Sequence, residues 1–386
     1  MAIAASLAAG IYRSSVHART AGDDFDVICD AGNVLARNGN PYDLAAISAA
    51  GGTTGVPLTY PPLTAIALRP ACGRIAPWWF VLAGTALLLA LTARLPGVRA
   101  APAAWAIAAG CAALPWLLLT GNVIALAEGF CGLAAAWAIA RSRPAAFGAA
   151  LGAAAFLKLM PAAYLIAAFV RWPVRTALAA VAAAAALFGA LELATYGVAP
   201  SALGQYWHAV RSGWNGFVGE ELRFGSENNP SMFSFLPIAT AYVGLGTRAG
   251  YALAAALALV FVAGWIRAWR THAGTEAARV WLALLAMAVI AVIYPRFKPY
   301  SMVFLLPAMA MVLARLDEKQ LRAALIVACL LPNAALIAMT WLATVPPLPT
   351  PVVFALQYAQ WMLVAAAVAL ALRPSVLRRL IAREAA

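Results

Sequence analysis

Long apolar stretches, separated by short polar or proline-containing segments, run along almost the whole chain. Residues 177–194, 323–342 and 352–372 approach or reach the roughly 20 residues that an α-helix needs to cross the hydrocarbon core of a bilayer. Backbone polar groups inside a membrane must bond within the protein, so such stretches form helices rather than open-edged strands. The pattern predicts one all-α polytopic membrane domain over residues 1–386, with about ten to twelve transmembrane helices. Residues 2–12 are interpreted as a short first helix.

Residues 24–39 carry the pattern of a shorter, amphipathic helix. Apolar side chains recur along one side of it, at Val27, Ile28, Ala31, Val34 and Leu35. Polar side chains occupy the other side, at Asp26, Asp30, Asn33 and Arg37. Asp23 or Asp24 can cap the N-terminus, and Gly39 is expected to stop the helix. We expect this helix to lie in the membrane interface, with its N-terminal carboxylates at the bilayer surface.

The composition and the distribution of charge support the same fold class. Hydrophobic residues make up 65% of the chain and charged residues 11%, whereas an ordinary soluble domain has about 25% charged residues. The formal net charge of +13 resides in short segments between apolar stretches, without a basic stripe interleaved with aromatics, so no nucleic acid partner is expected. The arginine-rich segments are residues 94–99, 141–143, 171–175, 267–279, 315–322 and 373–383.

Placing all six arginine-rich segments in the cytoplasm gives a consistent orientation under the positive-inside rule. It requires residues 145–170 to form a helical hairpin broken near Lys158, and residues 232–246 to stay on the external side as a short segment. Two long external loops result, at about residues 19–77 and 198–230. Eight of the 14 acidic residues lie in them: Asp23, Asp24, Asp26, Asp30, Asp43, Glu220, Glu221 and Glu227. The external face therefore carries most of the candidate chemistry.

Short strings in the first external loop are more specific than the composition. The most specific are Asp-Phe-Asp-Val-Ile at residues 24–28 and Thr-Tyr-Pro-Pro at residues 59–62. Further strings lie at residues 31–32, 39–43, 121–122, 156–161, 229–231 and 294–300. Together they resemble glycosyltransferase family 87, which comprises polyprenyl-phosphate-sugar-dependent membrane mannosyltransferases and relatives with the C-type glycosyltransferase fold. A departure is the turn with Arg296 and Lys298, where the mannosyltransferases are richer in histidine.

The resemblance implies an inverting glycosyltransferase on the external face of a bacterial inner membrane. Such an enzyme moves one sugar, with mannose as the first candidate, from a polyprenyl-phosphate donor to a lipid or glycan acceptor. The reaction needs a carboxylate base within reach of the acceptor hydroxyl. By family analogy this base is Asp24, and the alternative is that Asp24 only caps the following helix.

Metal and cofactor chemistry are not predicted. The five cysteines form no Cys-x-x-Cys pair, and the spacing of Cys29 and Cys72 favours a structural disulfide only weakly. Asp24 and Asp26 form an Asp-x-Asp pair, which holds a divalent cation in nucleotide-sugar enzymes. On a helix, however, residues two apart point about 200° away from each other. We therefore expect no metal site and no cofactor.

Three cations are candidates for binding the donor phosphate. Lys158 lies in an apolar stretch, where an ionisable group indicates a functional site, although a lysine that extends to the interface is the structural alternative. Arg296 and Lys298 lie in a short external turn, against the positive-inside trend, and suit an anionic partner. Simple binding of lipid headgroups is their alternative role.

Three further residues are candidates for contact with the substrates. Asp26 lies beside the proposed base, Tyr60 can stack on a sugar or hydrogen-bond to it, and Asn229 can reach acceptor hydroxyls. For Tyr60 a purely structural role in a proline-stiffened loop is the alternative.

Two other classes of protein share parts of this pattern. A transporter or flippase of lipid-linked sugars would use many helices, a proline-broken segment and intramembrane carboxylates such as Glu128 and Glu192. A glutamate bonded to a neighbouring helix is the more ordinary role for either residue. A non-catalytic membrane scaffold is the third class.

Overall fold

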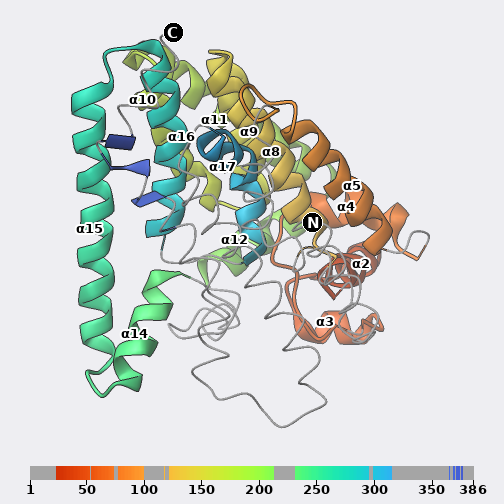
Figure 1. Cartoon of the computed structure of the whole chain (residues 1–386). Helices are drawn as coiled ribbons and strands as arrows, with labels where there is room; N and C mark the ends of the chain where they lie inside the picture. The colour runs from red at the N-terminus through yellow and green to blue at the C-terminus, as the bar shows by residue number, and fades with distance from the viewer. Residues whose placement is uncertain are drawn as a thin grey trace.

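The computed structural model describes residues 23–314, except 53, 74–76, 100–116, 118–120, 213–230 and 295–298, and a few residues between 365 and 376. All secondary-structure elements in these residues are helices, which confirms the all-α prediction (Figure 1). The predicted first helix at residues 2–12, Asn229, Arg296 and Lys298 lie outside the described residues.

Four described helices are long and apolar enough to cross a membrane: α8 (Val123–Ala140), α11 (Val174–Val198), α15 (Thr247–His272) and α16 (Glu276–Ile293). Shorter apolar helices accompany them, namely α5 (Pro77–Thr92), α9 (Pro144–Leu157), α14 (Met232–Tyr242) and α17 (Leu306–Leu313), the last preceded by the 3-10 helix η4 (Pro299–Leu305). The chain is therefore a multi-pass membrane protein, and the total of about ten to twelve helices stays a prediction.

The long helices differ in how much of their surface is buried. α16 is largely covered by its neighbours, whereas α11 and α15 expose large apolar side chains such as Leu193 and Leu259, which are 71% and 70% exposed. Exposed apolar surface on this scale suits contact with hydrocarbon rather than water.

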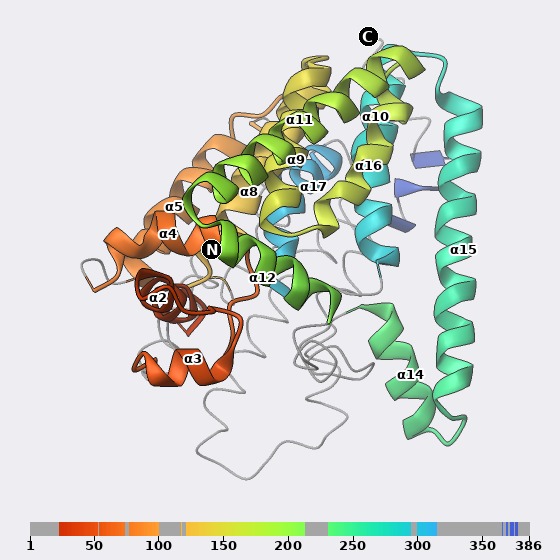
Figure 2. The same ribbon diagram turned by 180° about the vertical axis from the view of Figure 1, so that it is seen from behind.

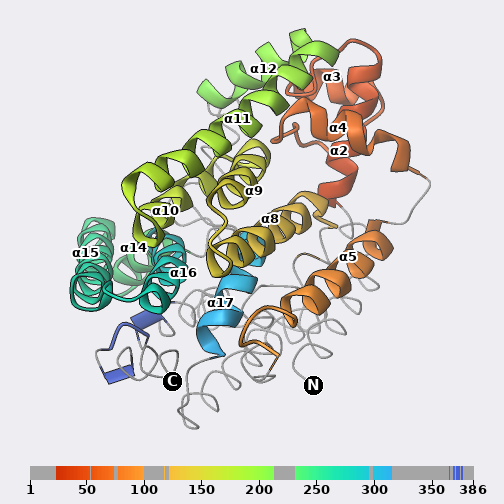
Figure 3. The same cartoon turned by 90° about the horizontal axis from the view of Figure 1, so that it is seen from above.

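Close packing of α9 on α11 depends on two glycines (Figure 3). Gly148 and Gly152 lie one turn apart on α9, and a Cβ at either position would collide with the backbone of Ala180 or Ala184 on α11. Small residues at this spacing let membrane helices approach closely, which strengthens dispersion contacts between them.

We expect Gly148→Val to lower the free energy of unfolding by about 1–3 kcal/mol, because overpacking forces the two backbones apart. The measurement is the melting temperature of the purified protein in detergent. Gly189→Val on α11 is the matched control, since a Cβ at Gly189 meets no atom within 4 Å. Equal melting temperatures for the two variants would contradict the packing.

The predicted hairpin with a break near Lys158 is confirmed. α9 ends at Leu157, Lys158 has an extended backbone (φ −149°, ψ 132°), and the chain returns through the 3-10 helix η2 (Met160–Leu165) and α10 (Ile166–Arg171). Pro161 lies in the first turn of η2, where a backbone N–H would have no partner within the helix and its absence removes no hydrogen bond.

The returning segment ends in a buried arginine. Arg171 donates to the carbonyl of Ile139 at 3.0 Å and to the carboxylate of Glu276, so it joins the end of α10 to the end of α8 and the start of α16. These termini lie at the end of the bundle opposite Lys158.

Short helices gather at the Lys158 end of the bundle. Figures 1 and 2 show α2 (Asp23–Ala36), α3 (Leu44–Ala49), α12 (Pro200–Arg211) and α14 there, whereas α10 and the connection between α15 and α16 lie at the other end. α4 (Pro62–Leu68) and the 3-10 helix η1 (Arg69–Ala71) pack against α2. The segments predicted to share one face of the membrane thus lie together.

The amphipathic helix forms as predicted, but its apolar side is not turned to lipid. Val27, Ile28, Ala31 and Val34 are buried, and the helix packs on α4 and η1. Protein rather than lipid therefore covers these side chains, and the membrane-interface position of the helix stays a prediction. The left-handed residue at the helix end is Asn38 (φ 58°), while Gly39 N–H donates to the carbonyl of Val34.

Cys29 and Cys72 form a disulfide with a Cα–Cα distance of 5.7 Å. The sequence spacing favoured this pairing only weakly, because the turns that bring α2 onto η1 are tertiary features. The bond ties the middle of α2 to the end of η1.

We expect the Cys29→Ser/Cys72→Ser double variant to lose about 2–4 kcal/mol of stability, because the unfolded chain regains the freedom of the closed loop. The measurement is the detergent melting temperature, with and without reductant. Cys131→Ser is the control, since Cys131 is a free thiol. If reductant left the melting temperature of the unsubstituted protein unchanged, the disulfide would be contradicted.

Candidate functional site

Asn122 caps the N-terminus of α8 and lies at the centre of a polar cluster. Its Oδ1 accepts a hydrogen bond from the N–H of Ala125 at 2.7 Å, and its side chain is almost fully buried. The preceding Gly121 has a φ of +63°, a conformation that suits glycine in the turn before the helix. The cap fixes which way the carboxamide points, so its Nδ2 is directed away from the helix.

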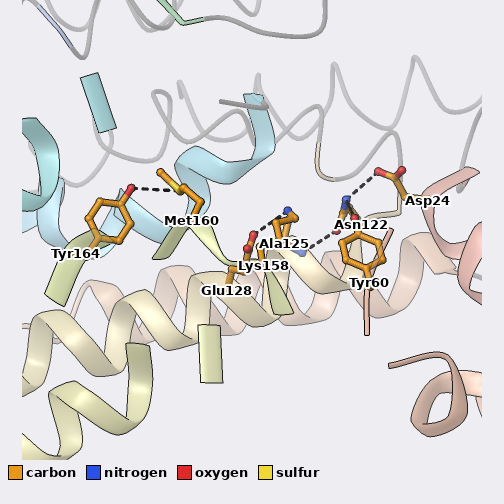
Figure 4. Close-up of polar contacts among 8 residues, drawn as sticks. All are labelled: Asp24, Tyr60, Asn122, Ala125, Glu128, Lys158, Met160 and Tyr164. Carbon is orange, nitrogen blue, oxygen red and sulfur yellow. Dashed lines mark hydrogen bonds and ion pairs between the residues drawn. The ribbon is translucent and has the colours of Figure 1, made fainter. Parts of the chain in front are cut away.

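The Nδ2 of Asn122 donates to two side chains that are distant in sequence (Figure 4). One acceptor is Asp24 Oδ2 at 2.9 Å, and the other is Tyr60 Oη at 3.1 Å. One carboxamide thereby brings together the start of α2, the loop before α4 and the start of α8. Asp24 is partly exposed, so its carboxylate is held from one side and accessible from another.

Tyr60 is itself held in place through its backbone. Its carbonyl accepts a hydrogen bond from Tyr42 Oη at 2.9 Å, and Pro61 and Pro62 follow it directly. Burial raises the pKa of Tyr42 well above its ordinary value, with smaller contributions from Tyr206 and Glu192. Tyr42 therefore stays protonated and remains a donor to this carbonyl at physiological pH.

A lysine–glutamate pair adjoins Tyr60. Lys158 Nζ lies 3.0 Å from Glu128 Oε2 and 5.8 Å from the centroid of the Tyr60 ring, within the range of a cation–π contact. Glu128 follows Asn122 by six residues on α8, which is roughly 9 Å along the helix axis. The carboxylate of Glu128 is buried, whereas 23% of the Lys158 side chain is exposed.

The arrangement combines a held carboxylate, Asp24, with a cation, Lys158, and Asn122 and Tyr60 link the two. Asp24 can accept a proton from a hydroxyl group that approaches its exposed side. Lys158 can support negative charge that develops on an oxygen, and its attraction to Glu128 keeps the ammonium in position. Such a site suits the transfer of a group between two oxygen atoms.

The structure brings together three of the predicted site residues, Asp24, Tyr60 and Lys158. Asp26 is exposed and follows Asp24 by two residues on the same helix, so the helical turn points it in a different direction. Among the residues described, no group of three or more His, Cys, Asp or Glu side chains is placed to hold a metal ion.

Sequence reasoning missed the role of Asn122 in this cluster and the partner of Glu128. A Gly-Asn pair ahead of an apolar stretch indicates a helix cap, but it does not reveal that the free end of the carboxamide reaches Asp24. Glu128 was interpreted as a glutamate bonded to a neighbouring helix, and its pairing with Lys158 confirms that interpretation.

Comparison with known proteins gives one family match. A family model described as glycosyltransferase family 87 matches residues 58–295, well over half of the chain. The matched segment contains Tyr60, Asn122, Glu128 and Lys158, and Asp24 precedes it. No curated protein and no solved structure matches the chain.

Proposed function

The chain belongs to glycosyltransferase family 87, and from this membership we propose that it transfers a sugar from a polyprenyl-phosphate donor to a lipid or glycan acceptor. Mannose is the first candidate for the sugar. The observation that carries the proposal is the carboxylate of Asp24, held by Asn122 next to Tyr60 and the Lys158–Glu128 pair.

The reaction is a single displacement at the anomeric carbon. The acceptor oxygen forms a bond to that carbon as the bond from the carbon to the phosphate oxygen breaks, so the configuration inverts. The hydroxyl proton passes to the carboxylate of Asp24, and polyprenyl phosphate leaves with the bonding electrons. The hydrogen bond from Asn122 keeps one carboxylate oxygen in place, which leaves the other to face the acceptor.

Lys158 is proposed to support the leaving phosphate. Its side chain is the exposed member of the lysine–glutamate pair, and its Nζ lies 5.8 Å from the centroid of the Tyr60 ring. Arg296 and Lys298 are proposed to add positive charge for the same phosphate, and Asn229 and Asp26 to contact the acceptor. Tyr60 is proposed to bind a sugar hydroxyl through its Oη.

Two observations support a site outside the cytoplasm, on the external face of a bacterial inner membrane. Cys29, which forms a disulfide with Cys72, lies on the same helix as Asp24, and such bonds form and persist in oxidising compartments. The arginine-rich ends at 141–143 and 171–175 lie at the opposite end of the bundle, where the positive-inside rule puts the cytoplasm.

The donor class is tested with purified protein in detergent and a labelled sugar on two carriers. We expect transfer from polyprenyl-phosphate mannose and none from the corresponding nucleotide sugar. The products are separated by chromatography, and the linkage is determined by NMR. Transfer from the nucleotide sugar alone, or a product that retains the anomeric configuration, would contradict the proposed donor and displacement.

We expect Asn122→Ser to lower the transfer rate by about tenfold or more. Serine still caps α8, but it removes both hydrogen bonds from Nδ2, so Asp24 loses its fixed orientation. The measurement separates kcat from KM, because a misoriented base lowers kcat. Thr275→Ser is the control, since it preserves a side-chain cap of α16 that is remote from Asp24. Unchanged kcat for Asn122→Ser would refute the positioning role.

A further inference from the structure

A cavity lies beside the C-terminal half of α2, away from Asp24. It is a cleft of about 820 Å³ between the C-terminal half of α2, η1 and the junction of α11 with α12. Its walls include Gly32, Leu35, Asn38, Arg69, Val198 and Ser201. Gly32 follows Asp24 by eight residues, roughly 12 Å along the helix, so the cleft is separate from the polar cluster around Asn122.

Arg69 is an exposed cation that lines this cleft, and its backbone is anchored. Its carbonyl accepts from the N–H of Cys72, and the disulfide of Cys72 anchors η1 to α2. Gly32 gives the arginine room, because a Cβ at Gly32 would lie only 3.2 Å from Arg69 Cβ. Neither the Lys158–Glu128 pair nor the Arg171–Glu276 pair involves Arg69.

The cleft is continuous with the surface of α11 that suits lipid. Val198 lines the cleft and is 61% exposed, and Leu193 and Tyr196 on the preceding turns are exposed to a similar degree. Other walls, Leu35, Ile66 and Pro70, are apolar. An arginine above such a surface matches a molecule with an anionic head and hydrocarbon chains.

We propose that this cleft binds the phosphate headgroup of an anionic membrane lipid, with Arg69 as its counterion and the lipid chains along the exposed end of α11. A free phosphate ion would gain nothing from the apolar walls, so the lipid is the occupant that uses both parts of the cleft. Arg69 also lies in the first external loop, against the positive-inside trend. The site is independent of the catalytic role proposed for Asp24.

The test uses the full chain in phosphatidylcholine nanodiscs and spin-labelled lipids, whose immobilised fraction gives a relative association constant. We expect the parent to prefer phosphatidic acid to phosphatidylcholine. Arg69→Gln should lower that preference about tenfold, because it removes a charge-assisted hydrogen bond. Arg211→Gln is the matched control, an exposed arginine at the other end of α12.

A second variant tests the same cleft by filling it, without a change of charge. Ser201→Trp places a large side chain in the cleft from an exposed position, and it should also abolish the preference for phosphatidic acid. Preference at the parental level in both variants would overturn the site. Displacement of the spin-labelled lipid by inorganic phosphate would overturn the lipid as the occupant. Sugar transfer by the parent is measured in parallel, so failure of the lipid site and failure of the proposed function are distinguishable.

Discussion

Asp24→Asn is expected to lower sugar transfer by about 10²- to 10⁴-fold, the usual contribution of a general base. Asparagine has nearly the same shape and still accepts a hydrogen bond from Asn122 through its carbonyl oxygen, but it takes up no proton. Asp24 is the second residue of α2 rather than its N-cap, and asparagine preserves the hydrogen bond with Asn122, so α2 should form normally. The loss is therefore expected in kcat, with little change in the melting temperature.

A matched control for this variant lies in the same loop. Asp43→Asn exchanges the same groups at an exposed position, where the side chain caps α3 by accepting from the N–H of Ala45. It should transfer sugar at the parental rate. If Asp24→Asn transferred as fast as Asp43→Asn, Asp24 would have only a structural role and the base would have to be sought elsewhere.

Lys158→Met is expected to lower the free energy of unfolding by about 3–5 kcal/mol, because it leaves the carboxylate of Glu128 buried without its partner. The same substitution should also abolish transfer if the ammonium supports the leaving phosphate. Stability is measured as a melting temperature in detergent, and activity as initial transfer rate.

The double variant Glu128→Leu/Lys158→Met separates the two effects. Replacing both partners of a buried pair by apolar residues of similar volume is often neutral, so most of the stability should return. Transfer should remain lost, because the cation is still absent. A double variant with parental stability and parental transfer would assign Lys158 to the fold alone.

Local patterns were enough to predict α2 and the break near Lys158. The apolar periodicity of α2 and the Lys158 to Pro161 break were both present in the sequence and are confirmed. What covers the apolar side of α2 could not be predicted from this pattern. An amphipathic pattern indicates that one side of a helix is buried, but it does not show whether lipid or another helix, such as α4, covers that side.

The candidate site was only partly predictable, for a related reason. Asp24, Tyr60 and Lys158 were identified by residue type and by resemblance to a family, whereas the group that joins them was not. Asn122 is separated from Asp24 by 98 residues and from Tyr60 by 62, and contacts over such distances depend on how helices pack. The pairing of Cys29 with Cys72 likewise depends on tertiary packing, because it requires η1 to pack on α2.

Family membership also bears on the alternative functions. A match over residues 58–295 makes the chain a membrane glycosyltransferase, which the transporter and scaffold interpretations do not explain. The intramembrane carboxylate that favoured a transporter, Glu128, forms an ion pair with Lys158 beside the proposed catalytic carboxylate.

The central claim is that sugar transfer takes place at the carboxylate held by Asn122. A structure of the Asp24→Asn variant with a bound polyprenyl-phosphate sugar tests it most directly, because the slow variant preserves the donor. We expect the anomeric carbon to lie between position 24 and Tyr60, with the phosphate on the Lys158 side. A donor bound at the Arg171 end of the bundle, or with its sugar out of reach of position 24, would contradict the claim.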